Sequence, residues 1–391
     1  MALGLGRFAY ALLLPSMRLE LRWSFAIAGA MNTANAFGYL AGALLAAPAA
    51  RRLGMRGSFL GGLAVTVASL LATAATGNTA VLVALRALVG VSGAICFVTG
   101  AGLVAEAGTT GSARRAASLL AIYFAGGGAG IAVSGLAIPF LLASTPVASG
   151  WRWAWVLLAG LGLLALALAT PAARASREPP TAPTADRRWP ARRFRALFVS
   201  YALFGAGYIA YMTFIVAFLK GRGAGPGEIT VFWVVLGAAS VTGAFLWVRP
   251  LVRLRGGRAP GMVLGVVSVG ALLPLVSSSP EAVMGSAALF GGSFLAVVTA
   301  VTMVTRRSLR PHHWTPAIAS LTVAFALGQC AGPVLAGVLS DGPAGLRAGL
   351  GLSAAVLVVG ALIALTQRHY EISAGDPLPA VGPTGRETDR W

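Results

Sequence analysis

The chain has few charged residues, and few of those are acidic. Only 10% of its 391 residues are charged, and 11 aspartates and glutamates stand against 30 lysines and arginines. Ordinary soluble domains carry about 25% charged residues. Because 57% of the chain is hydrophobic, this composition excludes an ordinary soluble domain and indicates a membrane protein.

Cysteine and histidine are also scarce, with two and three residues. Cys96 and Cys330 lie in separate apolar stretches, and His312 and His313 adjoin each other in a basic segment without a nearby acid. None of them has the spacing of a disulfide framework or a metal site. The chain has no Gly-Lys-Ser/Thr phosphate loop and no serine elbow. We therefore expect no enzyme, no cofactor, no metal and no direct use of ATP.

Long apolar runs dominate the chain instead. A helix needs roughly 20 apolar residues to cross a bilayer. Twelve stretches come close to that length: 2–17, 24–47, 58–77, 80–105, 117–142, 152–170, 196–219, 229–248, 260–279, 282–304, 317–339 and 345–365. They predict an all-α membrane protein with 12 transmembrane helices.

The net charge of +19 is distributed unevenly between the two sides of the predicted membrane. Segments on the same side as the two termini hold 22 of the 30 lysines and arginines, and those on the other side hold six. Because positive residues gather in cytoplasmic loops, both termini are predicted to be cytoplasmic. The bias toward Ala, Arg and Gly, with Lys220 as the single lysine, is typical of a GC-rich bacterium. We expect a multi-pass protein of the plasma (inner) membrane. Its partner is the lipid bilayer, and we expect no binding of nucleic acid.

The chain repeats itself at a shift of 201 residues. Matching pairs are Gly4-x-Gly6 with Gly205-x-Gly207, Ala9-Tyr10 with Ala210-Tyr211, and Arg52-Leu53 with Arg253-Leu254. Six spans in each half give both halves the same orientation. The predicted units are an N-terminal bundle (1–170), a cytoplasmic linker (171–195), a C-terminal bundle (196–366) and a disordered cytoplasmic tail (367–391). The first span is short, so we expect about ten apolar residues before Met1 in the native gene.

Two arginines, Arg7 and Arg86, fall inside predicted spans. An arginine at the bilayer centre costs about 2.5–3.5 kcal/mol, so both should face the bundle interior. Because no acid lies mid-span, the pair favours an anionic solute. Five polar side chains are predicted to complete the solute site: Tyr10, Asn35, Tyr208, Tyr211 and Gln329. Hydrogen bonds between helices are the alternative role for each of the five.

Coupling and gating residues are predicted from the remaining polar and small residues. Glu106, at the cytoplasmic end of the fourth span, is the candidate for ion coupling. Small residues let helices approach closely, and proline loosens a helix. Gly90, Gly128, Gly332 and Pro333 are therefore candidates for hinges or sliding surfaces, with static packing as the alternative.

Three groups of motifs resemble a known family. Arg51-Arg52-Leu53-Gly54-Met55-Arg56 resembles the signature loop of the major facilitator superfamily, with Arg51 where that family has an aspartate. Arg86-x-x-x-Gly90 resembles a second motif of the superfamily. The YbfB-type branch is resembled by Gly4-Leu5-Gly6-Arg7-Phe8-Ala9-Tyr10, Phe204-Gly205-x-Gly207-Tyr208 and Leu321-Thr322-x-x-Phe325-x-x-Gly328-Gln329-x-x-Gly332-Pro333.

The resemblance implies a secondary transporter with two pseudo-symmetric six-helix bundles. Helices 1, 4, 7 and 10 would line its cavity, with additions from helices 2, 5, 8 and 11. We expect a monomer that moves a small organic solute, alone or together with H+ or another ion, by alternating access. A proton-coupled exporter of drugs or metabolites is the alternative. A non-transporting membrane sensor is a remote one, because residues 171–195 and 367–391 are too short for an output domain.

Overall fold

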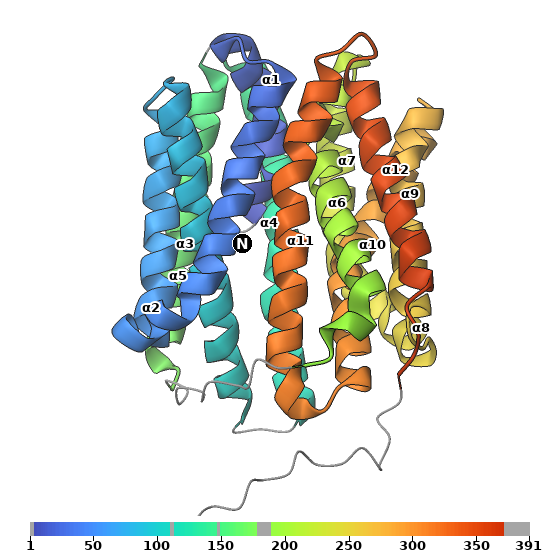
Figure 1. Ribbon diagram of the computed structural model, residues 1–391. Coiled ribbons are helices and arrows are strands. Elements are labelled where there is room, and N and C mark those ends of the chain that lie inside the picture. Colours follow the sequence, from blue (N-terminus) through green and yellow to red (C-terminus); the bar gives the residue numbers. More distant parts are fainter. Residues whose placement is uncertain (1–3, 110–112, 147–148, 178–188, 371–391) are drawn as a thin grey trace, which may run out of the picture.

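The structure is a computed structural model that describes residues 4–109, 113–146, 149–177 and 189–370. Within these ranges the regular elements are all helices (Figure 1). They are η1 (Gly4–Phe8), α1 (Tyr10–Leu21), α2 (Phe25–Ala74), α3 (Thr79–Thr109), α4 (Ala113–Ser144), α5 (Gly150–Ala175), η2 (Ala191–Phe194), α6 (Arg195–Gly221), α7 (Pro226–Leu246), α8 (Val248–Arg253), α9 (Arg258–Val276), α10 (Pro280–Ser308), α11 (Pro311–Ser340) and α12 (Leu346–Leu365).

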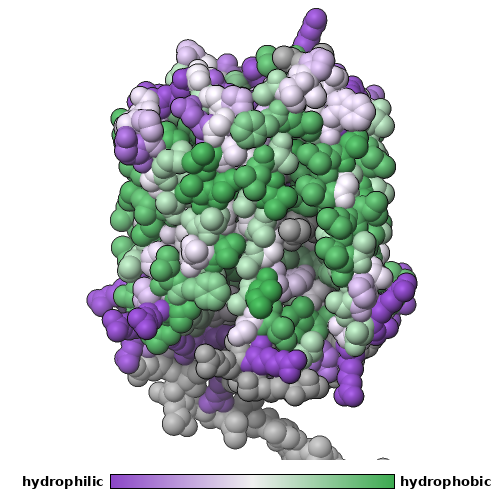
Figure 2. Space-filling model, turned by 180° about the vertical axis from the view of Figure 1, so that it is seen from behind, coloured by the Kyte–Doolittle hydropathy of each residue, from purple (hydrophilic) through white to green (hydrophobic). Residues whose placement is uncertain are grey.

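Ten helices in the described part of the chain are long and apolar enough to cross a membrane. On the face shown in Figure 2, apolar side chains form a broad band across the middle, with polar residues gathered at both ends. This distribution suits a helical bundle whose middle lies in lipid, where helices satisfy their own backbone groups. The sequence-based prediction of a multi-pass all-α protein is confirmed.

Helix α2 holds two of the predicted spans in one 50-residue element. Gly54 interrupts it with φ 72° and ψ 163°, a conformation that side chains rarely allow. The chain therefore reverses there between two helical arms, 25–53 and 55–74. The first predicted span is likewise divided, into η1 and the 12-residue α1.

Several helix starts follow from local sequence. The Ser24 hydroxyl accepts a hydrogen bond from the Ile27 N–H at the start of α2, and the Ser279 hydroxyl does the same for Ala282 in α10. Serine at this position satisfies one of the free N–H groups of a helix. Proline opens α7, α10 and α11, where its missing N–H costs nothing.

Close helix contacts recur at the 201-residue shift of the sequence repeat. Gly42 faces the carbonyl of Val91, and Gly243 faces the carbonyl of Gly292. A second pair repeats in the same way: Gly90 faces the carbonyl of Asn35, and Gly291 that of Leu236. In each case a Cβ would collide with backbone. The α2–α3 packing of the first half (4–177) is thus repeated by α7–α10 in the second half (189–370).

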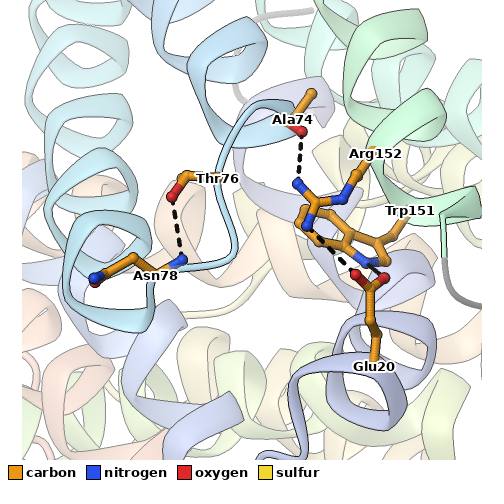
Figure 3. Close-up of polar contacts among 6 residues, drawn as sticks. All are labelled: Glu20, Ala74, Thr76, Asn78, Trp151 and Arg152. Atoms are coloured by element: carbon orange, nitrogen blue, oxygen red, sulfur yellow. Dashed lines mark hydrogen bonds and ion pairs between the residues drawn. The ribbon is translucent and has the colours of Figure 1, made fainter.

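Polar contacts tie together the upper end of the first half, where α1 ends (Figure 3). Glu20 accepts a hydrogen bond from the Trp151 indole and forms an ion pair with Arg152 at 3.4 Å. Arg152 also donates to the carbonyl of Ala74, at 3.0 Å. These contacts join α1, α2 and α5 into one unit.

The two halves meet chiefly along two helix pairs, α2 with α11 and α4 with α7, and α1 also contacts α6. Gly29 on α2 lies against the carbonyl of Pro333, and Gly337 on α11 lies against that of Phe25. Between α4 and α7, the Trp233 indole donates to the Ser134 hydroxyl at 3.3 Å. Figure 1 shows the first arm of α2 beside α11 at the top and slanting away from it toward the bottom.

Candidate functional site

Arg7 lies on the seam between the two halves. It is 5% exposed, and its Nη2 donates a hydrogen bond to Gln329 Oε1 on α11 at 2.6 Å. Gln329 Nε2 in turn donates to the Tyr208 hydroxyl on α6 at 2.9 Å. The π-helical turn η1 brings Arg7 to this position. Three of the predicted site residues are therefore one hydrogen-bonded chain.

Arg7 keeps unused hydrogen-bonding capacity. Its guanidinium stands 5.1 Å from the ring centroid of Tyr39 on α2. Within the described residues, Arg7 forms no ion pair, and the bond to Gln329 is its only hydrogen bond. A guanidinium has five N–H donors in a planar fork, so most of its donors are available to another molecule.

Arg86 is held by more protein groups than Arg7, and of its nitrogens only the buried Nε has no hydrogen-bond partner among the described residues. It is 1% exposed and donates to the Gly6 carbonyl at 2.6 Å and to Asn32 Oδ1 at 3.0 Å. The Tyr10 and Trp155 rings lie 4.8 and 5.7 Å from its guanidinium. Asn32 continues the network to the Thr213 hydroxyl on α6, at 2.7 Å.

The other predicted polar residues bind within their own halves. Asn35 donates to the backbone carbonyl of Arg86 at 3.1 Å, and Tyr10 donates to the carbonyl of Ala28 at 2.9 Å. The Tyr211 hydroxyl pairs with Ser286 at 2.5 Å, away from Arg7 in the bonding network. Tyr10 and Asn35 therefore support Arg86, and Tyr211 packs α6 onto α10.

Glu106 lies far from both arginines. It follows Arg86 by 20 residues on the uninterrupted helix α3, a rise of about 30 Å. It is half-buried near the lower end of the bundle. The structure does not bring this coupling candidate into the Arg7 cluster.

The four candidate gating residues fall into two groups. Gly128 faces Ser240 on α7, and Pro333 faces Gly29 on α2, so both lie on the seam between the halves. Gly90 and Gly332 instead pack α3 on α2 and α11 on α6, within one half each.

Asp341 makes a contact across the seam that the sequence analysis did not assign. Its carboxylate oxygens accept hydrogen bonds from the Phe25 and Ala26 N–H groups at 2.7 and 2.9 Å. These N–H groups begin α2, where the helix dipole favours a negative charge. The end of α11 is thus bound to the start of α2 at the upper end. The only sequence signal was an acid at a predicted helix end.

An aromatic wall, formed by Tyr201, Phe204, Tyr208, Phe294 and Phe325, lies beside Gln329 and was also missed. Its rings come from α6, α10 and α11. Neighbouring rings in it are nearly parallel, with interplanar angles of 8° for Tyr201–Phe204 and 10° for Tyr208–Phe325. Phe8, next to Arg7, contacts Phe294 across the seam at 6.1 Å.

Among the described residues, no three His, Cys, Asp or Glu side chains gather in one place. The arrangement is a buried cation and an aromatic wall on a seam between two packed halves. Together with the long apolar helices, this arrangement defines the class as a multi-pass membrane protein with a polar seam inside its bundle.

Residues 1–365 match the family described as uncharacterised MFS-type transporter YbfB, and the chain belongs to this family. The chain is thus a member of the major facilitator superfamily and a transporter, not an enzyme, as the sequence motifs predicted. No curated protein matches the chain.

Solved structures share its fold at low identity. A mutant of the nucleoside transporter NupG is 13% identical with a TM-score of 0.72, over 94% of this chain and 99% of that one. A bacterial homologue of the human lysosomal transporter Spinster, inward-facing and occupied, is 17% identical with a TM-score of 0.69, over 93% and 94%. Its inward-facing, unoccupied form is 16% identical with a TM-score of 0.66, over 93% and 95%. Identities this low show the fold alone.

Proposed function

We propose that the chain is a secondary transporter that moves a small organic anion by alternating access, with Arg7 holding the acidic end of the solute. The observation that carries this proposal is the buried Arg7 guanidinium on the seam, with one amide partner and no ion pair among the described residues. Burying a charge without a counter-ion is costly, so an anion that completes the site gains affinity.

The moving units would be two six-helix bundles, residues 1–170 and 196–366, joined by the linker 171–195 and followed by the tail 367–391. The repeated glycine contacts support this division. Counting the two arms of α2 separately, and η1 with α1 as the first span, gives 12 spans. An even number of spans keeps both termini on one side, and the excess of basic residues there supports a cytoplasmic location for them, at a bacterial inner membrane.

The transport cycle would be a rocking of one bundle against the other. Phe25, Ala26 and Gly29 hold α2 against α11 at the upper end, while the helices diverge below (Figure 1). With the termini in the cytoplasm, the upper end is the outer side, and this conformation would receive solute from the cytoplasm. Opening the outer side would break the Asp341, Gly29 and Gly128 contacts and the Arg7–Gln329 bond together.

Transport currents in proteoliposomes test the proposal. A panel of organic acids is compared with the matched neutral amides, for the native chain, Arg7→Gln and Arg7→Lys. We expect currents with at least one acid, a loss of about 10- to 100-fold in apparent affinity in Arg7→Gln, and partial rescue in Arg7→Lys. Arg174→Gln, at an exposed position on α5, is the matched control. Unchanged acid transport in Arg7→Gln would refute the role of Arg7.

The aromatic wall favours a second candidate, a proton-coupled exporter of apolar drugs or metabolites. Such an exporter would carry neutral or cationic compounds and would need a titrating group, for which Glu106 is the candidate. Drug resistance that is lost in Glu106→Gln and kept in Arg7→Gln would favour the exporter. We infer a monomer in either case, because a single chain supplies both of the bundles that alternating access requires.

A further inference from the structure

The aromatic wall extends away from Arg7 as a stack of ring faces. Phe325 lies at its centre: its ring centroid is 4.7 Å from that of Tyr201, 5.5 Å from Phe204 and 5.6 Å from Tyr208. The angles between these planes are 16°, 19° and 10°. Apolar cores pack aromatic rings edge-to-face as readily as in offset stacks. A set of parallel rings instead presents aligned faces, on which a further flat ring can stack.

Tyr39 stands across the seam from this wall. It belongs to α2 in the first half, and its ring lies 5.1 Å from the Arg7 guanidinium. Gln329 and Tyr208 continue from Arg7 to the wall through two hydrogen bonds. Arg7 therefore has an aromatic residue of the first half on one side and the wall of the second half on the other.

Two aromatic residues near Arg7 and Gln329 keep part of their surface exposed. Tyr39 and Phe325 are only half-buried, while Tyr208 is 4% exposed. Within the described residues, the Tyr39 hydroxyl makes no hydrogen bond, although Tyr10, Tyr123 and Tyr211 all do. A hydroxyl without a hydrogen bond therefore belongs to the ring next to the Arg7 guanidinium, and Gln329 and Tyr208 link this guanidinium to the half-buried ring of Phe325.

From this geometry we infer that the transported anion is a planar aromatic acid. Its carboxylate binds Arg7 and the Tyr39 hydroxyl, and its ring stacks on Phe325. This inference rests on the proposed function and narrows it to a substrate class. A planar carboxylate suits the bidentate fork of arginine. Stacking on an aromatic face adds to the binding free energy that comes from apolar burial. A flat aromatic ring should therefore bind more tightly than a puckered saturated ring of the same size.

Three probes of similar size separate the contribution of the aromatic ring to binding from that of the negative charge. Benzoate has an aromatic ring and a negative charge. Cyclohexanecarboxylate has the charge on a saturated ring, and benzamide has the aromatic ring without the charge. Binding to the full chain in lipid nanodiscs is measured by calorimetry, with naphthoate as a larger ring. Phe325→Leu removes the stacking face, and Phe140→Leu, at a residue 55% exposed on the surface of α4, is its matched control.

We expect benzoate to bind about two- to tenfold more tightly than cyclohexanecarboxylate. Phe325→Leu should bring this ratio close to one without changing cyclohexanecarboxylate binding, which shows that the variant is folded. Phe140→Leu should keep the ratio. Arg7→Gln should instead remove the preference for benzoate over benzamide.

Equal affinities for benzoate and cyclohexanecarboxylate, or a ratio of these affinities that is unchanged in Phe325→Leu, would overturn the aromatic assignment but keep the proposal of an anion transporter. Binding of aliphatic acids without binding of benzoate would also overturn only the aromatic assignment. Benzamide binding as tightly as benzoate, or no binding of any acid, would refute the proposed function itself.

Discussion

The contact of Asp341 with the start of α2 gives a prediction about which side of the protein is open. Its carboxylate accepts two backbone hydrogen bonds from the other half, at 2.7 and 2.9 Å. Asp341→Ala removes both bonds and the charge at the helix N-terminus. These bonds exist only while the halves are closed at this end, so the substitution destabilises that conformation selectively.

The free-energy cost of Asp341→Ala can be estimated from related substitutions. Losing a side-chain cap costs about 0.5–2 kcal/mol, and a charge at an exposed helix end contributes about 0.3–1 kcal/mol. Asp341 is exposed, and Ser24 still caps α2, so we take about 1 kcal/mol. An equilibrium between the two conformations then shifts about fivefold toward the one open at the upper end.

Distances between spin labels at Ala75 and Ala344 measure this shift, in a background with both cysteines changed to serine. Both positions are exposed at the upper end, one in each half. Glu228→Ala is the matched control, since Glu228 is also an exposed carboxylate but bonds to Gly225 of its own helix start, at 3.1 Å. An unchanged distance distribution in Asp341→Ala, or the same change in Glu228→Ala, would refute the reasoning.

Two further predictions concern packing and the second arginine. Gly128→Ala should impair transport and lower the melting temperature, because the added Cβ would collide with Ser240 across the seam. Such overpacking costs about 1–3 kcal/mol. Gly127→Ala is the control: its Cβ meets open space, so this variant should match the native chain in the same assays. Arg86→Gln should chiefly lower thermal stability, because it leaves the Gly6 carbonyl and Asn32 Oδ1 without a donor, at about 1.5–3 kcal/mol for each lost bond to a charged group. Arg7→Gln should keep the native melting temperature within a few degrees, and a fall as large as that of Arg86→Gln would argue against a ligand role for Arg7.

Much of the architecture was predictable because the bilayer imposes helix length and charge asymmetry directly on the sequence. The apolar runs and the basic loops both reflect that single constraint. The repeat was visible as well, since glycines such as Gly42 and Gly243 are fixed by close helix contacts in each half. Element boundaries were less predictable: Gly54 joins two spans through a single residue, and the turn of η1 has no marker in its apolar pattern.

The sequence was enough to predict which residues form the candidate site, but not which of them are hydrogen-bonded to one another. Arg7, Gln329 and Tyr208 were all expected, yet their spacing of more than 120 residues hides that they form one chain of hydrogen bonds. The sequence does not distinguish the two arginines; only the structure shows that both terminal nitrogens of Arg86 donate to protein groups of the first half. Phe204 and Phe325 resembled ordinary lipid-facing or core residues, because an aromatic residue in an apolar run carries no sign of which surface it faces.

For Arg7 to hold a transported solute, it must face a water-accessible pathway between the halves. Arg7→Cys, in a background without the native cysteines, can be treated with a charged thiol reagent from the cytoplasmic side. Leu13→Cys is the control, because Leu13 is fully buried. We expect position 7 to react, position 13 not to react, and solute bound at the seam to slow the reaction. A position 7 that is as unreactive as position 13, or that reacts only with lipid-soluble reagents, would contradict a water-accessible pathway at Arg7.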